Sequence, residues 1–128
     1  MKLIIKYSKQ REGLMEILKG TDTHPTADAL YLEMRQKFPN VSLATVYRNL
    51  RQLSEQGQIL KIDAGTGSEH YDGNPNQHYH FVCEGCGRVY DLDVDVFNEL
   101  DHAVTEKTGF LVARHSLLFY GLCKNCQQ

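Results

Sequence analysis

The chain carries four cysteines, which fall into two pairs of identical spacing, Cys83-x2-Cys86 and Cys123-x2-Cys126. Each pair directs two thiolates at one point, so two pairs can complete a closed tetrahedral four-thiolate site of the kind that Zn²⁺ favours. Such a site leaves no open ligand position, and its zinc would therefore be structural. The alternatives are two disulfides or four unrelated thiols. A zinc here would join distant segments, which strongly constrains how the second half can fold.

At 128 residues the chain has room for one or two small domains, whose modest core a structural metal would support. We expect no signal peptide, because the apolar run at residues 3–5 is short and ends at Lys6. No apolar stretch approaches the about 18 residues that a membrane span needs. These features predict a reducing, cytoplasmic location, where thiolates bind metals rather than form disulfides.

The net charge is −2, but the charges are unevenly distributed along the chain. Residues 1–62 hold ten Lys/Arg against six Asp/Glu, whereas residues 63–128 hold four against ten. A basic first half and an acidic second half indicate two different tasks, although a chance asymmetry of solvated side chains is the alternative. Contacts to nucleic acid are therefore expected in the first half.

Residues 1–72 show the pattern of three helices followed by a hairpin. Ser8 is expected to cap a helix that ends near Gly20, Thr26 a second helix, and Ser42 a third helix that closes at Gly57. Two short strands at residues 59–62 and 69–72 follow, joined by a turn at 64–67. This order predicts a winged helix-turn-helix domain.

Residues 73–77 form the best linker in the chain and are expected to act as a hinge. Beyond it, residues 78–128 predict strands at 78–82, 88–92 and 110–120 and a helix at 95–108 with Gly109 as its C-cap. The helix is expected to turn apolar side chains inward: Val96, Phe97, Leu100 and Val104. The whole chain thus predicts an α+β fold, with a small C-terminal α/β domain that carries the zinc.

The third helix has two contrasting faces. Val46, Leu50 and Leu53 cluster on one side at helical spacing. The other side carries side chains that read bases or bind phosphates: Thr45, Arg48, Arg51 and Gln52. An ordinary solvated face is the alternative, but the helix is the third of three and a basic hairpin with Lys61 follows. One recognition helix covers one half-site, so we expect a homodimer on double-stranded DNA.

A second set of candidate ligands combines imidazoles and carboxylates. His78 and His80 are two residues apart on an expected strand and therefore share a face. The other members come from the first domain, from the end of the wing and from the next strand: His24, Asp72 and Asp91. A mixed nitrogen and oxygen shell suits Fe²⁺, Mn²⁺, Co²⁺ or Zn²⁺. Each residue taken alone could simply be a polar side chain in a loop or turn.

Five runs of this sequence resemble the ferric uptake regulator (Fur) superfamily, and within it the PerR-type peroxide-sensing branch. They are HPTAD at residues 24–28, ATVYRNL at 44–50, HYH at 78–80, CEGCG at 83–87 and YGLCKNC at 120–126. The runs span most of the chain in family order. The resemblance implies a metal-dependent dimeric transcriptional repressor, with an N-terminal winged helix and a C-terminal dimerisation domain.

The resemblance also implies roles for individual residues. The structural zinc ligands would be Cys83, Cys86, Cys123 and Cys126. The regulatory ligands for Fe²⁺ or Mn²⁺ would be His24, Asp72, His78, His80 and Asp91, of which the two oxidised by peroxide would be His24 and His78. Asp rather than Glu at position 72 resembles the PerR-type branch. Apart from the resemblance, the outer side of the third helix and the hairpin predict these DNA-contacting side chains: Thr45, Tyr47, Arg48, Arg51, Gln52 and Lys61.

One further site and one further residue carry weaker expectations. A further metal site of many iron regulators would map to Gln77, Tyr79, Asn98 and His115, and we do not expect it because three of these are poor ligands. His70 stands where the family usually has a basic wing residue, and we interpret it as close to DNA or inert.

The sequence as a whole predicts a repressor that senses peroxide through iron-catalysed oxidation of its ligand histidines. One alternative is a repressor that responds to iron or manganese availability alone, and another is a zinc-containing DNA-binding module without sensing. Two-histidine, one-carboxylate shells also serve non-haem iron oxygenases, but no motif for a substrate pocket is visible. We expect no enzymatic activity, no small-molecule substrate and no membrane partner.

Overall fold

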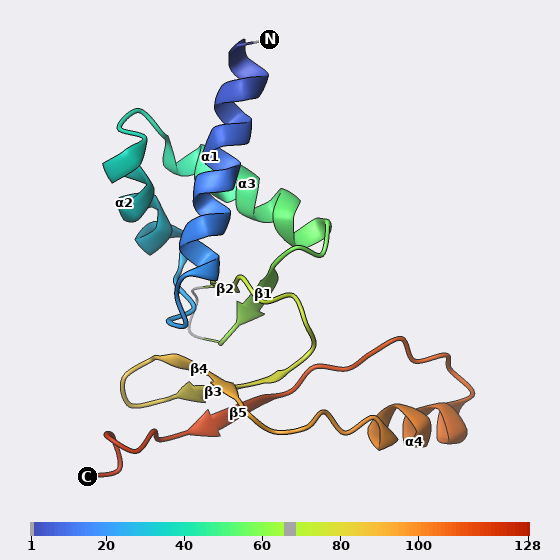
Figure 1. Cartoon of the computed structure of the whole chain (residues 1–128). Helices are drawn as coiled ribbons and strands as arrows, with labels where there is room; N and C mark the ends of the chain where they lie inside the picture. The colour runs from blue at the N-terminus through green and yellow to red at the C-terminus, as the bar shows by residue number, and fades with distance from the viewer. Residues whose placement is uncertain (1, 66–68) are drawn as a thin grey trace. The chain divides into compact units, whose positions relative to one another are not determined.

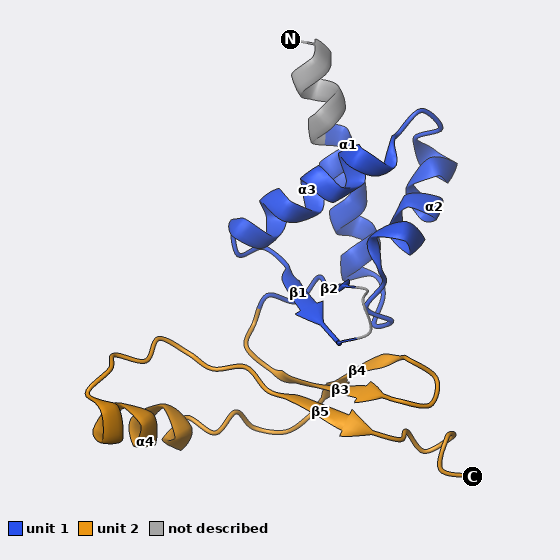
Figure 2. Ribbon diagram, turned by 180° about the vertical axis from the view of Figure 1, so that it is seen from behind, with its two compact units in different colours: residues 1–75 blue, residues 76–128 orange. Residues whose placement is uncertain are grey.

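The computed structural model describes residues 2–65 and 69–128, with side chains described from residue 9 onwards. The chain divides into two compact units, Met1–Pro75 and Asn76–Gln128 (Figure 2). Figure 1 traces the elements of the first unit, which are α1 (Lys2–Lys19), α2 (Ala27–Lys37), α3 (Leu43–Glu55), β1 (Leu60–Asp63) and β2 (Glu69–Asp72). The second unit contains β3 (Tyr79–Cys83), β4 (Val89–Leu92), α4 (Glu99–Thr108) and β5 (Leu118–Gly121).

Side-chain caps start two of the helices of unit 1, as the sequence predicts. The Thr26 hydroxyl accepts a hydrogen bond from the Ala29 amide at the start of α2, and the Ser42 hydroxyl accepts one from the Thr45 amide at the start of α3. The prediction for the first helix is wrong at its N-terminus, because α1 begins at Lys2 rather than after Ser8. Residues 2–7 are mostly good helix formers, so the helix continues upstream of Ser8.

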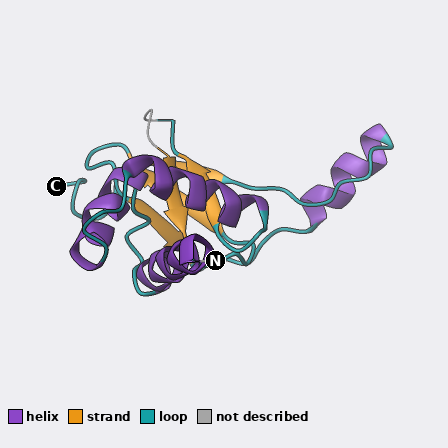
Figure 3. Ribbon diagram, turned by 90° about the horizontal axis from the view of Figure 1, so that it is seen from above, coloured by secondary structure: helices purple, strands orange, loops and turns teal. Residues whose placement is uncertain are grey.

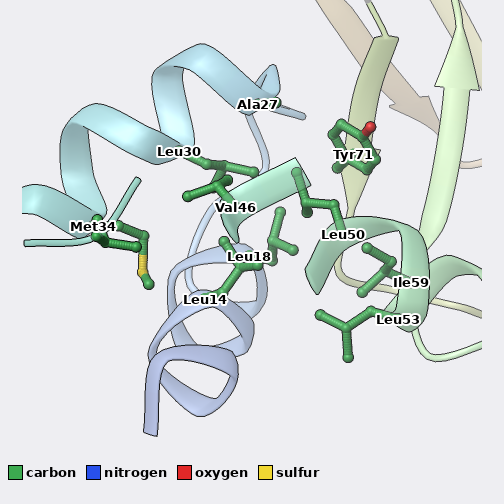
Figure 4. Packing of buried hydrophobic residues seen from close by; sticks show 11 residues of the cluster. Leu14, Leu18, Ala27, Leu30, Met34, Val46, Leu50, Leu53, Ile59 and Tyr71 are labelled. Carbon is green, nitrogen blue, oxygen red and sulfur yellow. The ribbon is translucent and has the colours of Figure 1, made fainter. Parts of the chain in front are cut away.

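The core of unit 1 lies where its three helices meet the hairpin (Figure 4). Val46, Leu50 and Leu53 of α3 are completely buried, which confirms the predicted inward face of this helix. They pack with residues of the other elements: Leu14, Leu18, Ala27, Leu30, Met34, Ile59 and Tyr71. Each large apolar side chain buried in this way contributes about 1.5–3 kcal/mol, so α3 is held firmly and presents a defined outer face.

The hairpin β1–β2 is antiparallel, with Leu60 opposite Asp72 and Asp63 opposite Glu69. β2 has the predicted bounds, whereas β1 begins and ends one residue later than predicted, and Ile59 just before it is buried in the core. Of the predicted turn, residues 66 and 67 lie outside the described residues. On its other side β2 meets the segment before α2, through an isolated antiparallel bridge between Thr26 and His70.

Unit 2 is built on a three-stranded sheet in the order β4-β3-β5. β3 is antiparallel to β4, with His80 opposite Asp91, and parallel to β5, with Cys83 opposite Gly121. The predicted strand at 110–120 forms only over Leu118–Gly121. Residues 110–117 are apolar enough for a strand, but in the described structure only the Leu117 carbonyl contacts a strand, by accepting from the His80 amide, and Leu111 is 96% exposed. Composition alone therefore overestimates the length of this strand.

Helix α4 stands at the end of two long loops, away from the sheet of its own unit (Figures 1 and 3). Gly109 ends it in the left-handed conformation, as predicted. It begins at Glu99 rather than at residue 95, so Phe97 lies just before it. The apolar residues expected to face inward are not buried, because Phe97, Leu100 and Val104 are about half exposed. The prediction of an inward face is wrong because unit 2 offers this helix no surface to pack on.

Among the residues that the structure describes, no helix combines the length and the apolar character needed to cross a membrane.

Candidate metal centres

The four cysteines meet at one end of the sheet of unit 2. Cys83 ends β3 and Cys123 follows β5, and these strands are neighbours, so the two CxxC turns lie side by side. All four Sγ atoms lie within 4.8 Å of one another, and none forms a disulfide. Sulfurs on a tetrahedron with Zn–S bonds of about 2.3 Å would be about 3.8 Å apart, which this arrangement accommodates. The donor set therefore fits a closed structural zinc site.

Two further observations support this fit. The backbone amides of Cys123 and Cys86 point at the Sγ of Cys83, at 3.3 and 3.4 Å, and they lower the pKa of that thiol to about 6. A Cβ at Gly85 would lie 2.9 Å from the Cβ of Cys126, so a glycine is needed where the turns approach.

In unit 1, His24 and Asp72 form a buried pair. Their side chains are joined between His24 Nε2 and Asp72 Oδ2 at 3.2 Å, and the residues are only 2% and 6% exposed. Asp72 ends β2, and its Oδ1 also accepts a hydrogen bond from the Asn74 amide. His24 has a φ of 51°, a left-handed conformation that costs a residue other than glycine about 1–3 kcal/mol. The fold of unit 1 thus holds this imidazole in a strained and specific position.

In unit 2, β3 and β4 bring three candidate ligands together. Asp91 Oδ1 lies 2.8 Å from His78 Nε2 and 3.1 Å from His80 Nε2, and the two imidazole centroids are 4.3 Å apart. His78 Nδ1 lies 2.6 Å from the carbonyl oxygen of Asn76 and must therefore carry a proton. With Nδ1 held by this carbonyl, Nε2, which lies beside Asp91 Oδ1, is the ring nitrogen that a metal ion could bind.

The structure therefore sorts the five predicted ligands of the mixed shell into two sets, two residues in unit 1 and three in unit 2. Imidazole nitrogens and carboxylate oxygens are the donors that Fe²⁺ and Mn²⁺ accept, and thiolates are absent from both sets. Neither set alone offers more than three side chains. Each is suited to hold part of the coordination shell of such an ion.

The side chains predicted to contact DNA differ in their solvent exposure and in their contacts within unit 1. Tyr47, Arg48 and Arg51 project from the exposed side of α3. Thr45 is half-buried at the first turn, where its hydroxyl hydrogen-bonds Ser42. Two other predicted contacts are engaged within unit 1. Gln52 Oε1 accepts a hydrogen bond from Arg11 Nη2 at 2.8 Å, and Lys61 Nζ lies 3.6 Å from Glu69 Oε1.

His115 lies in a hydrogen-bonded network. Its Nε2 is 2.7 Å from the Tyr79 hydroxyl and its Nδ1 is 2.8 Å from Asp101 Oδ1, while its carbonyl accepts from Gln77. In the described part of the chain, the groups of side chains able to hold a metal do not include these residues. The ring of His70, which is expected to be close to DNA or inert, contacts the backbone of His24, with Nδ1 2.7 Å from its carbonyl oxygen.

Comparisons with known proteins agree with this architecture. The sequence matches the Ferric uptake regulator family over residues 2–120. The peroxide-responsive repressor PerR of Staphylococcus aureus (strain Mu50 / ATCC 700699) is 37% identical over 123 residues, which cover 96% of this chain and 83% of that protein.

Two solved structures extend the likeness to the fold. The crystal structure of the Campylobacter jejuni peroxide stress regulator superposes with a TM-score of 0.84 at 37% identity, covering 98% of this chain and 94% of that one. A zinc uptake regulator complexed with zinc and DNA superposes with a TM-score of 0.71 at 26% identity, covering 92% and 81%. These matches confirm the predicted α+β fold and the resemblance carried by the five sequence runs. The chain belongs to the ferric uptake regulator family.

Proposed function

We propose that this protein is a metal-dependent, DNA-binding transcriptional repressor that senses peroxide. The observation that carries the proposal is the division of one mixed ligand set between the two units, with His24 and Asp72 in one and His78, His80 and Asp91 in the other. The likeness to peroxide-responsive regulators over nearly the whole chain supports it. Family members of this kind are regulators rather than enzymes, and the oxygenase alternative is set aside.

Together these five residues would hold Fe²⁺ or Mn²⁺ and so join unit 1 to unit 2. A metal that binds one relative orientation of the units better than others shifts the population toward that orientation. Only an orientation with the correct spacing of two recognition helices would bind an operator well. Metal and operator should then strengthen each other's binding by the same factor.

Iron bound there would supply one-electron chemistry toward peroxide. His24 and His78 are the side chains that we propose become oxidised. An imidazole that has gained oxygen is a poorer donor, so the ligand set loses whichever of these two histidines is oxidised. The two units are then no longer held in the orientation that fits the operator, and repression ends. Mn²⁺ held by the same residues would support DNA binding without this oxidation.

The homodimer is proposed from the apolar residues that unit 2 leaves uncovered. Phe97 just before α4, Leu100 in its first turn, and Phe110 and Leu111 after it are all about half exposed or more. Exposed apolar surface gathered on one helix and the loop beside it indicates a site of association. A second copy of the chain, related by two-fold symmetry, would cover it and place two α3 helices on two half-sites.

The test compares operator binding by the Fe²⁺ and Mn²⁺ forms, each before and after stoichiometric peroxide. We expect both forms to bind, and only the iron form to lose binding after peroxide. Mass spectrometry should then show a gain of one oxygen on the peptide that contains His24 or His78. The peptide with His102, an exposed histidine that is not among the proposed ligands, is the internal control and should stay unmodified.

An iron form that stays intact and still binds operator after peroxide would contradict peroxide sensing. It would assign the protein to the alternative function, a repressor that responds to iron or manganese availability alone. If operator affinity does not change when Fe²⁺ or Mn²⁺ is added, the proposal of a regulatory metal site is wrong.

A further inference from the structure

The wing strand β2 contacts His24 from two sides. Asp72 meets the imidazole ring, with Oδ2 at 3.2 Å from Nε2. His70, two residues earlier on the same strand, meets the backbone, with Nδ1 at 2.7 Å from the carbonyl oxygen of His24. Residues two apart on a strand share a face, which is why both can reach the same residue. We infer that His70 is a positioning residue for the metal ligand His24, an inference that rests on the proposed function of His24.

The conformation of His24 explains why such a contact is needed. Its φ of 51° lies in the region that side chains other than that of glycine rarely adopt. The next residue is Pro25, which further restricts the backbone of the residue before it. A strained conformation persists only where the surrounding structure holds it. The position of the His24 imidazole therefore depends on what fixes the residues around it.

Two contacts with β2 supply that constraint. The first is the hydrogen bond from the His70 ring to the carbonyl of His24. The second is the antiparallel bridge between Thr26 and His70, in which the Tyr71 amide donates to the carbonyl of Pro25 at 3.0 Å. Residues 24–26 thus lie along β2 on the side opposite β1. Of the two contacts, only the first uses a side chain and can be removed by substitution.

The chemistry of the contact defines what the ring does. A carbonyl oxygen can only accept, so Nδ1 of His70 must carry the proton and donate it. The ring therefore donates to the backbone of His24. Among the described residues, His70 does not belong to either group of side chains that could bind a metal ion. Partners that orient a metal ligand commonly change metal affinity about 10–100-fold when they are removed.

Because β2 also pairs with β1, the contact connects the ligand to the proposed DNA surface. Lys61, a predicted DNA contact, lies on β1 opposite Tyr71. A hairpin held in place by DNA would hold His70, and through it the backbone of His24. Through His70, binding of DNA to the hairpin would therefore affect the position of the metal ligand His24, and metal binding at His24 would affect the hairpin.

The experiment measures Mn²⁺ affinity of the full-length, zinc-loaded protein by the electron paramagnetic resonance signal of free Mn²⁺. His70→Leu removes the donor, and His70→Asn keeps an N–H at the position of Nδ1 on a side chain with the same branching as leucine. We expect His70→Leu to bind Mn²⁺ about 10-fold more weakly than wild type, and His70→Asn to bind nearly as tightly as wild type. His102→Leu, which changes an exposed histidine of unit 2, should leave the affinity unchanged.

Equal Mn²⁺ affinity in wild type and His70→Leu would overturn the inference, as would an equal loss in the leucine and asparagine variants. Circular dichroism and zinc content establish that each variant is folded, and His70→Ala replaces the leucine variant as the donor-free protein if that variant does not fold. A His24→Ala variant distinguishes failure of this inference from failure of the proposed function. If His24→Ala binds Mn²⁺ as tightly as wild type, then the proposed site itself is wrong, whereas a loss there without a loss in His70→Leu contradicts the role of His70 alone.

Discussion

The two candidate metal centres differ in how the fold supplies their ligands. The cysteine centre draws all four donors from unit 2, on neighbouring strands, with every Sγ within 4.8 Å of the others. The histidine and aspartate ligands are divided, two in unit 1 and three in unit 2. A metal whose ligands all belong to one unit stabilises the fold of that unit. A metal whose ligands are divided between units can instead select how the units are oriented.

Donor chemistry follows the same division. Four thiolates form a closed tetrahedral shell with no free position, which suits a metal that never has to leave or react. Imidazoles and carboxylates bind Fe²⁺ and Mn²⁺ less tightly, and the bound iron can react with peroxide. The centre that holds the fold together and the centre that responds to the environment therefore differ in ligand type as well as in placement. Three predictions test this contrast.

The largest effect is expected from Cys83→Ser. Binding of structural zinc is worth about 10–16 kcal/mol in small zinc-binding peptides, so losing one of four thiolates should remove zinc and unfold much of unit 2. We expect loss of bound zinc together with loss of the dimer, measured by metal analysis and by light scattering after gel filtration. His78→Ala is the matched control and should retain both. One zinc per chain and a dimeric mass in Cys83→Ser would show that the four cysteines are not the zinc site.

A smaller and reversible effect is expected from a chelator of moderate strength. It should remove the regulatory metal and weaken operator binding about 5–150-fold, the range typical of coupling between two sites, while zinc stays bound. Added Mn²⁺ should restore operator binding. Fluorescence anisotropy with labelled operator and metal analysis of the same samples measure both quantities. If zinc and the regulatory metal leave together, the two centres are not functionally distinct.

An effect on operator affinity of about the same size is expected from substitutions on the DNA surface, which should leave both metal centres intact. Arg48→Ala should weaken operator binding by about 1–3 kcal/mol if Arg48 contacts a base, with less effect on nonspecific DNA. Arg51→Ala should weaken all sequences alike, as loss of a phosphate contact does. The content of zinc and of regulatory metal should remain that of wild type in both variants. Unchanged operator affinity in Arg48→Ala would contradict the proposed reading face of α3.

Much of the local structure could be predicted because it depends on residues close together in sequence. The caps at Thr26 and Ser42 and the end of α4 at Gly109 each depend on a few neighbouring residues. The buried face of α3 follows from helical spacing of apolar residues. The spacing of the two CxxC pairs predicted a metal centre for the same reason, since each pair forms its turn locally.

Two of the predictions that failed depended on a partner that the sequence does not reveal. Residues 110–117 have the composition of a strand, but in the described structure their contact with a strand is limited to the Leu117 carbonyl, which accepts from the His80 amide of β3. The apolar side of α4 predicted an inward face, and its own unit provides nothing to pack against. His70 has no local signal at all, because its partner is a backbone carbonyl 46 residues away. The structure points to His70 only through its contact partner His24, whose positive φ shows a backbone that the surrounding residues must hold in place.

Residue type and spacing were sufficient to establish which side chains could bind metal and which helix could meet DNA. Donor chemistry is a property of the side chain, and helical or strand periodicity is a property of the local chain. The pairing of β3 with β5 that brings the two CxxC turns together, and the bridge by which β2 holds His24, had to come from the fold. Both are contacts between segments distant in sequence, and such contacts form only where the packing of the whole unit offsets the entropy lost in bringing those segments together.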